Sequence, residues 1–259
     1  MERRRPGRSR CGEKLAADPT LDVNWEGQFG LTAFNDACFK GRVSGVEFLL
    51  KHPRIDVNKP QNEGCTPFYL ACGKGFKDVV SLLIADPRID VNKPADDGIT
   101  PFYFVCQKSH KEVVPLLLAD LRIDGNKPNQ DEATPLWIAS ENGNLSVVQL
   151  ILASRGEVDT RTKTIEGTED WNNKTPADAS FQGTRAQLEN KSEEEYTRKK
   201  ENGSLIATLL DSYERNPQQV RDQLRKQLGF AGQLVFVCFL SLIFMKDDLT
   251  VLCLFICRF

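Results

Sequence analysis

The feature that most constrains this chain is an internal repeat with a period of 34 residues. The sequence Asp-Val-Asn-Lys-Pro ends at Pro60 and again at Pro94, and Asp-Gly-Asn-Lys-Pro ends at Pro128. Four threonines follow the same period, and three of them precede a proline: Thr32, Thr66, Thr100 and Thr134. A strict period of this length indicates one small supersecondary unit stacked on copies of itself, without a single central core.

Each unit is predicted to contain two short helices and a loop. In the clearest copy, residues 61–94, Thr66 is a good N-cap and the proline after it suits the first helical position. Gly75 suits a left-handed C-cap, and Pro87 stops the second helix because the residue before a proline avoids the α region. Four apolar residues of that second helix fall on one face: Val79, Val80, Leu82 and Leu83.

This unit resembles an ankyrin repeat. The resemblance is carried by Gly64-Cys65-Thr66-Pro67-Phe68-Tyr69-Leu70-Ala71-Cys72, Gly75, Val79-Val80-Ser81-Leu82-Leu83 and Asp90-Val91-Asn92. These match the family's Gly-x-Thr-Pro-Leu-His-x-Ala-Ala, Gly, Val-Val-x-Leu-Leu and Ala-Asp-Val-Asn elements in order. The extra residue over the usual period of about 33 falls in the Asp-Pro-Arg link after the second helix. A tetratricopeptide repeat also has a period of about 34, but its Trp, Leu-Gly and Tyr signature is missing. The resemblance implies an all-α solenoid of helix-turn-helix units joined by hairpin-like loops.

The period divides the chain into an array and two flanks. We expect a disordered basic N-terminus at 1–14, with a localisation or acidic-partner patch as the alternative. The array is predicted at 15–160, as a partial unit at 15–29 that lacks its first helix and four repeats at 30–60, 61–94, 95–128 and 129–160. A degenerate fifth repeat is predicted at 161–216, with a polar insertion at 187–202 that forms a solvated helix or loop. An irregular helical cap, made of a C-terminal helix and an apolar tail, is predicted at 217–259.

The third repeat departs most from the pattern. Val105 replaces an alanine, Ser109 replaces the C-cap glycine, Pro115 enters the second helix and Gly125 replaces a valine. A residue other than glycine in left-handed geometry costs on the order of 1 kcal/mol, so we expect this repeat to be the least stable. The fourth repeat has Glu132 in place of its turn glycine.

The cysteines are predicted to be buried thiols. Cys38, Cys72 and Cys106 share one repeat position, which Ser140 fills in the fourth copy. Equivalent positions in stacked helices lie about 8–10 Å apart, beyond the roughly 7 Å that a disulfide spans. No Cys-x-x-Cys pair and only two histidines are present, so zinc-type spacing is missing. Buried thiols predict a reducing compartment, and we expect a cytoplasmic protein.

No sequence motif indicates catalysis or a cofactor. The chain has no Gly-x-Gly-x-x-Gly, Walker-type loop, His-Glu-x-x-His or Gly-x-Ser-x-Gly sequence. Cys106 and His110 are four residues apart, but Ser109 is expected to end the helix between them, so they need not share a face. A net charge of −2 argues against a general nucleic-acid binder. We therefore predict a monomeric, non-enzymatic chain without a cofactor or a bound metal.

The apolar tail leaves three interpretations open. Residues 234–245 contain Ser241 as their single polar residue, and Lys246-Asp247-Asp248 then interrupts the run. A helix over 229–245 would span about 25 Å, short of the roughly 30 Å hydrocarbon core of a membrane. The tail at 229–259 is predicted to cap the end of the solenoid, to associate with a membrane, or to belong to a truncated domain.

The resemblance implies a binding surface rather than a catalytic site. In this family the loop tips and the exposed side of the first helices form a concave face that recognises proteins. We predict a non-catalytic adaptor or scaffold; the alternative is a membrane-associated ankyrin protein anchored by the tail. The predicted partner-binding residues are Lys59, Asn62, Lys74, Lys93, Asp96, Asp97, Lys108, Lys127, Asn129, Asp131 and Glu141.

Two further properties of this face are predicted. Its charge is expected to be mixed, with more acidic tips toward the C-terminal end. Tyr69, Tyr103 and Trp137 stand where the family usually has histidine. They are interpreted either as buried supports of the Thr-Pro turn or as contact anchors for a partner.

Overall fold

A computed structural model of the chain describes residues 22–154, 156–164, 174–180 and 193–229. Over these residues the chain contains helices, turns and loops and no strand. One row is made of α2 (Ala33–Phe39), α4 (Pro67–Lys74), α6 (Pro101–Lys108), α8 (Pro135–Glu141) and α10 (Pro176–Ala179). A second row is made of α3 (Val43–Leu50), α5 (Lys77–Ala85), α7 (Val114–Ala119) and α9 (Leu145–Leu152).

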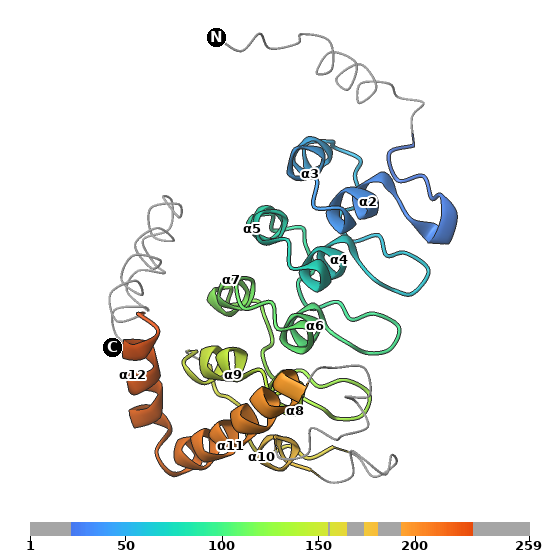
Figure 1. The fold of residues 1–259 in the computed structure, drawn as a ribbon. Coiled ribbons are helices and arrows are strands. Elements are labelled where there is room, and N and C mark those ends of the chain that lie inside the picture. Colours follow the sequence, from blue (N-terminus) through green and yellow to red (C-terminus); the bar gives the residue numbers. More distant parts are fainter. Residues whose placement is uncertain (1–21, 155, 165–173, 181–192, 230–259) are drawn as a thin grey trace, which may run out of the picture.

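The two rows of helices stack side by side, and the long loops project from the row of first helices (Figure 1). A short 3-10 turn, η1 (Gln28–Gly30), precedes the array, and α11 (Glu193–Arg215) and α12 (Pro217–Gln227) follow it. Each first helix packs against the first helix of the next repeat. The all-α solenoid predicted from the period is therefore confirmed.

The threonines begin the first helices as the sequence predicts. The side chain of Thr66 accepts a hydrogen bond from the backbone nitrogen of Tyr69, three residues on, at 3.1 Å. Thr100 and Thr134 do the same in their repeats. Thr32 has no proline after it, and a capping box with Asn35 takes over, because each side chain binds the other residue's backbone nitrogen. Such caps contribute about 1 kcal/mol each, so all four repeats begin their first helix with a similar local stabilisation.

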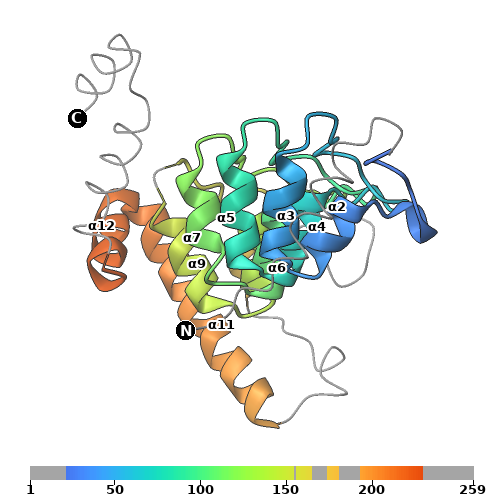
Figure 2. The same ribbon diagram turned by 90° about the horizontal axis from the view of Figure 1, so that it is seen from above.

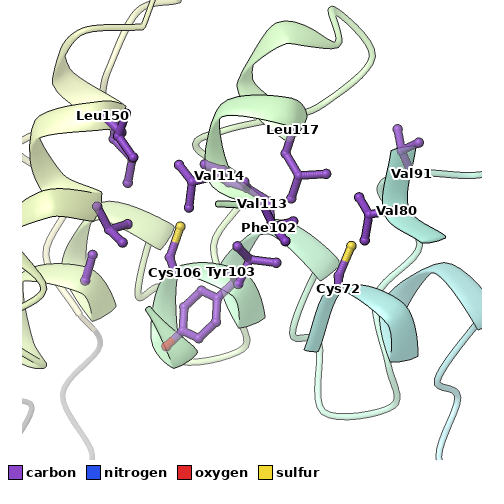
Figure 3. Close-up of a cluster of buried hydrophobic side chains, with 14 of the residues drawn as sticks. Cys72, Val80, Val91, Phe102, Tyr103, Cys106, Val113, Val114, Leu117 and Leu150 are labelled. Carbon is purple, nitrogen blue, oxygen red and sulfur yellow. The ribbon is translucent and has the colours of Figure 1, made fainter. Parts of the chain in front are cut away.

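The core lies between the two rows and runs through the stack as one cluster. Cys72 and Cys106 have no exposed surface, and Phe102 and Val114 are buried in the same cluster (Figure 3). Burial raises the pKa of the Cys38 thiol to about 12 and raises the pKa of the Cys72 and Cys106 thiols as well. The four cysteines of the described residues are free thiols. The predicted burial of the three equivalent cysteines is confirmed.

The glycine positions of the repeat are left-handed, including those where another residue stands. Gly75 ends α4 with φ 72°, and Ser109 ends α6 with φ 59°, as the sequence predicts. Glu132 has φ 59° at the turn position that Gly64 and Gly98 fill in the two preceding repeats. The third and fourth repeats therefore each hold one residue in a backbone geometry that favours glycine.

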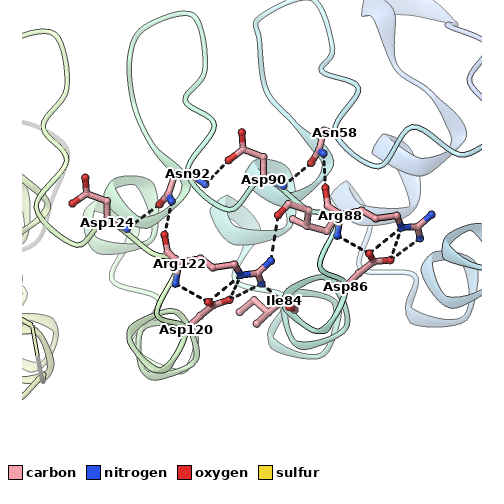
Figure 4. A network of polar contacts seen from close by, with 10 residues as sticks. Asn58, Ile84, Asp86, Arg88, Asp90, Asn92, Asp120, Arg122 and Asp124 are labelled. Carbon is pink, nitrogen blue, oxygen red and sulfur yellow. Dashed lines mark hydrogen bonds and ion pairs between the residues drawn. The ribbon is translucent and has the colours of Figure 1, made fainter. Parts of the chain in front are cut away.

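The Asp-Val-Asn segments link neighbouring repeats. Asn58 donates from its side chain to the carbonyl of Arg88 at 2.7 Å and accepts from the backbone nitrogen of Asp90 at 2.8 Å (Figure 4). Asn92 makes the same two bonds to Arg122 and Asp124 of the next repeat. Asn24 and Asn126 repeat the pattern at the two ends of the array. We call these four residues the asparagine ladder; they satisfy loop backbone groups across each junction from the partial first unit to the fourth repeat.

The extra residue of the period belongs to a second link between repeats. Arg88 forms an ion pair with Asp86 at 2.6 Å (Figure 4). The same Nη2 atom donates to the carbonyl of Leu50 at the end of α3. Arg122 pairs with Asp120 in the next repeat and donates to the carbonyl of Ile84 in α5. A cation at a helix C-terminus is favourable because the last carbonyls carry partial negative charge. This type of link thus ties the second and third repeats to the second helix of the preceding repeat.

The region after the fourth repeat bears on two alternatives that the sequence leaves open. The polar insertion at 187–202 is predicted to form a solvated helix or a loop. In the structure, residues 193–202 are helical and form the first half of α11. The reason is that glutamate, lysine and arginine are good helix formers and no proline interrupts the stretch. The helix α10 packs on α8, and α11 packs on α9 and α10. The boundaries of the repeats and of the two flanks, as given from the sequence, remain predictions.

The helix α12 covers the end of α9. Val220 and Leu224 are buried, and Arg225 donates from Nε to the carbonyl of Ala153 at 2.9 Å. Arg225 therefore donates to a carbonyl at the C-terminal end of α9, as Arg88 donates to one at the C-terminal end of α3. Among the described residues, no helix is long and apolar enough to span a membrane. The predicted basic N-terminus at 1–14 and the apolar tail from residue 230 lie outside the described residues.

Candidate functional site

The predicted binding residues lie on one side of the array, which we call the inner face. It consists of the exposed side of α2, α4, α6 and α8 together with the loop tips at 59–63, 93–97 and 127–132. Figure 1 shows these loops one after another along the stack, and in Figure 2 they gather on the same side of the array, beyond the row of first helices. The predicted residues divide into a group on the tips and a group at the ends of the first helices.

Lys59 and Asn62 lie on the first of these tips. The Nζ atom of Lys59 pairs with Glu26 at 2.7 Å and donates to the carbonyl of Asn24 at 3.0 Å. The hydrogen bond with Glu26 holds the pKa of Lys59 above its ordinary value. The backbone nitrogen of Asn62 donates to the carbonyl of Phe29, while its side chain is exposed. Lys59 is therefore committed to the preceding loop, and Asn62 is the more accessible of the two.

The next two tips hold the acidic residues of the predicted set. Asp96 and Asp97 are exposed, and the backbone nitrogen of Asp96 donates to the carbonyl of Glu63 at 3.1 Å. Gln130 donates from its side chain to the carbonyl of Asp96 at 3.2 Å, so the three tips are joined in sequence. Asp131 is also exposed. The exposed carboxylates of this face therefore stand on loops that hydrogen bonds hold to one another.

The remaining predicted tip residues are Asn129, Lys93 and Lys127. The side-chain oxygen of Asn129 accepts from the backbone nitrogens of Asp131 at 3.0 Å and Ala133 at 2.9 Å. Lys93 and Lys127 are half-buried where their loops begin. Asn129 thus shapes the tip from within, because its side chain bonds to its own loop.

Lysines occupy the ends of the first helices. Lys74 is the last residue of α4, and its Nζ atom lies 4.4 Å from the centre of the Phe39 ring in the preceding repeat. Lys108 is the last residue of α6, and its Nζ atom lies 5.3 Å from the centre of the Phe104 ring. Both lysines are exposed, whereas Glu141 at the end of α8 is half-buried. The structure thus brings Lys74 and Lys108 onto a part-aromatic surface and leaves Glu141 less accessible.

The equivalent aromatic residues of three repeats are buried. Tyr69, Tyr103 and Trp137 have 6%, 1% and 1% of their surface exposed. Burial raises the pKa of both tyrosines, and Trp137 donates from Nε1 to the carbonyl of Lys174 at 3.0 Å. Of the two interpretations of these residues, the structure favours buried supports over contact anchors.

Sequence reasoning missed several exposed aromatic residues. Trp25 and Phe29 on the first loop are 69% and 70% exposed. Phe104 was also missed, and its ring stacks on Tyr69 with the ring centres 5.0 Å apart. Their positions in the period carried a signal, because Trp25 stands where Lys59 stands one repeat later. A comparison of exposed positions between copies would have found them.

Cys106 and His110, four residues apart in the sequence, do not form a reactive pair. The Nε2 atom of His110 is hydrogen-bonded to the carbonyl of Gly73 at 2.9 Å, and burial raises the pKa of the Cys106 thiol. A nucleophilic cysteine needs a lowered pKa, so this pair is not a thiolate-imidazole site. Over the described residues, no group of three or more histidine, cysteine and acidic side chains is placed to hold a metal ion.

Two comparisons with known proteins bear on this surface. The family model described as ankyrin repeats (three copies) matches residues 7–95 and 87–163, which together span more than half of the chain. The matched region includes the inner face from its first tip to α9. A search of curated proteins finds no match to this chain.

Proposed function

The chain belongs to the ankyrin repeat family, whose arrays generally mediate protein–protein interaction, and we propose on this premise that it is a non-catalytic adaptor or scaffold. The partner is a protein, and it binds on the inner face. The observation that carries this proposal is the row of exposed polar side chains on tips that hydrogen bonds join to one another. A surface ordered before binding loses little conformational entropy when a partner docks.

Further parts of the proposal concern the form and the location of the protein. We propose that it is a monomer that works in the cytoplasm and binds no nucleic acid. The free thiols of Cys38, Cys65, Cys72 and Cys106 support a reducing compartment. Light scattering on the purified protein checks the monomer, and imaging of a tagged chain checks the location.

We also propose that the array ends in a degenerate fifth repeat. Its first helix is α10, capped by Thr175 and Asp178, and its second helix is the C-terminal half of α11. The packing of α10 on α8 and of α11 on α9 supports this assignment. In this arrangement α12 covers the end of α9 and the fifth repeat together, so the stack presents a capped end.

The test compares a change on the inner face with a matched change on the outer face. One variant carries Lys93→Ala and Asp97→Ala on the second predicted tip. Its control carries Lys77→Ala and Asp78→Ala, which are both exposed at the start of α5. We expect proteins captured by the wild-type chain to be lost from the tip variant and kept by the control, at equal melting temperatures. If both variants retain the same proteins, the partner does not bind at these tips.

A further inference from the structure

One lysine recurs at the same repeat position at the end of three consecutive first helices. Lys40 follows α2, Lys74 ends α4 and Lys108 ends α6, and the fourth repeat has Asn142 there. We call the three lysines the lysine ladder. Because α2 packs on α4 and α4 on α6, their backbone positions are separated by one helix spacing, about 8–10 Å.

The charges of this ladder are held in place but not neutralised along most of its length. Lys40 pairs with Asp36 at 2.7 Å. Lys74 and Lys108 lie over aromatic rings, and within the described residues neither has an acidic partner. An ammonium group over a ring keeps its full positive charge while the ring limits its motion. Two of the three lysines are therefore exposed cations with a preferred position.

The surface between the lysines is aromatic. Phe104 stacks on Tyr69 with an angle of 14° between the rings, and its ring lies over Gly73. A methyl group at Gly73 would collide with that ring, so the close approach depends on glycine at this position. The Phe39 ring is 40% exposed under Lys74. A ligand on the ladder would thus meet apolar contact area between its charged contacts.

The rim of the inner face has the opposite charge. Glu63, Asp96, Asp97 and Asp131 are exposed on the tips. These carboxylates repel acidic groups and leave the lysine ladder as the favourable position for them. A phosphate backbone is larger and more densely charged than a peptide, and both the acidic rim and the net charge of −2 disfavour it.

We propose that the lysine ladder binds an extended acidic segment of the protein partner, with carboxylates at every third residue. A chain in the extended polyproline II conformation advances about 3.1 Å per residue with three residues per turn, so every third side chain lies on the same face, about 9 Å from the last, which matches one helix spacing. Apolar residues between the carboxylates lie against Phe39 and Phe104. This inference rests on the proposed function and specifies the partner's chemistry.

The experiment measures binding of two labelled synthetic peptides to the full chain by fluorescence anisotropy. Both contain the same number of glutamate, leucine and serine residues. In one, glutamate recurs at every third position, and in the other, the glutamates are contiguous. We expect the spaced peptide to bind at least about fivefold more tightly, because only its carboxylates meet the lysines in register.

Three variants separate charge from folding. The Lys74→Ala/Lys108→Ala variant should weaken binding of the spaced peptide by about fivefold to tenfold. The Lys74→Arg/Lys108→Arg variant keeps both charges and should stay within about twofold of wild type. Lys77→Ala/Lys111→Ala removes two exposed lysines elsewhere and should change nothing. Circular dichroism melts identify any variant that does not fold. If the alanine variant does not fold, the test rests on two measurements: binding of the spaced peptide to the arginine variant, and its binding to wild type with added salt, which should be weaker.

The proposal is overturned by any of three results. The first is equal affinity of the chain for the two peptides. The second is an unchanged affinity of the alanine variant for the spaced peptide. The third is a higher affinity of the chain for a single-stranded oligothymidine probe than for the spaced peptide. Failure of this proposal is distinguishable from failure of the proposed function, because the tip variant is tested by protein capture without these peptides. Loss of captured proteins from the tip variant, combined with no preference for the spaced peptide, would refute the lysine ladder alone.

Discussion

The end of the first helix offers a test in which the same substitution, made in opposite directions, has unequal effects. Ser109 and Gly75 hold the same left-handed C-cap position, with φ 59° and 72°. Their surroundings differ. A Cβ atom at Gly75 would lie 2.6 Å from Nδ1 of His110, which is one repeat further along the chain. For Ser109, the residue at the position equivalent to His110 is Asn144. We therefore expect Ser109→Gly to stabilise the chain and Gly75→Ser to destabilise it by more.

The magnitudes follow from three terms. Left-handed geometry costs a serine about 1–2 kcal/mol, and glycine offsets about 0.5–1 kcal/mol of this through its freer unfolded state. Ser109→Gly should thus raise the free energy of unfolding by about 0.5–1 kcal/mol. Gly75→Ser incurs the same net strain and also displaces the imidazole of His110 from the carbonyl of Gly73, a hydrogen bond of 2.9 Å. Adding about 1–2 kcal/mol for that bond and the contact gives a loss of about 2 kcal/mol.

Urea denaturation followed by circular dichroism measures both changes. Hydrogen exchange at backbone amides of the third repeat locates the Ser109→Gly gain, because repeats in such an array open partly independently. Glu132→Gly is a second test of the strain term, since Glu132 also has φ 59°. If Ser109→Gly lowered the urea midpoint, the strain argument would be refuted. If Gly75→Ser cost no more than Ser109→Gly gains, the steric role of His110 would be refuted.

Three more predictions concern the links between repeats and the inner face. Hydrogen bonds from Arg88 hold the pKa of Asp86 below its ordinary value, so the contribution of this pair is complete above about pH 4 and is lost as the pH falls below it. An Arg88→Met variant should therefore lose less stability than wild type between neutral pH and pH 3, as measured by urea midpoints. Asn92→Ala removes two hydrogen bonds between repeats and should cost about 1–3 kcal/mol, and an unchanged midpoint would show that water replaces them fully. Gly73→Ala should destabilise the wild type despite the better helix propensity of alanine, yet should stabilise a Phe104→Ala background by about 1 kcal/mol; the same sign in both backgrounds would contradict the close approach of the ring.

The local elements of the fold could be predicted because each depends on residues that are close in sequence. Thr66 and the proline after it predict a helix start, and the structure confirms the hydrogen bond to Tyr69. Ser109 was predicted to be left-handed from its place in the period, and it is. The first half of α11 was predictable only as one of two alternatives, because a polar stretch with strong helix propensity carries no apolar pattern that distinguishes a solvated helix from a loop.

The candidate site was predictable in position but not in detail. The period places Lys74 and Lys108 at the ends of the first helices, and the structure exposes both. No local pattern shows that Phe104 stacks on Tyr69, because the two side chains belong to different repeats. Lys59 stands in the same predicted group, yet its ion pair with Glu26 commits it to the preceding loop.

The sequence by itself determined the architecture of this protein, since a period of 34 residues allows only a stack of similar units. It also determined the burial of the equivalent cysteines and the caps of the helices, which follow from helical geometry alone. Only the tertiary structure decided what joins the units. The asparagine ladder and the Arg88 link connect groups 30 to 38 residues apart, and their partners in the other repeat are backbone carbonyls and backbone nitrogens, which carry no sequence signal. The lysine ladder likewise depends on rings and charges from neighbouring repeats that only the stacking brings together.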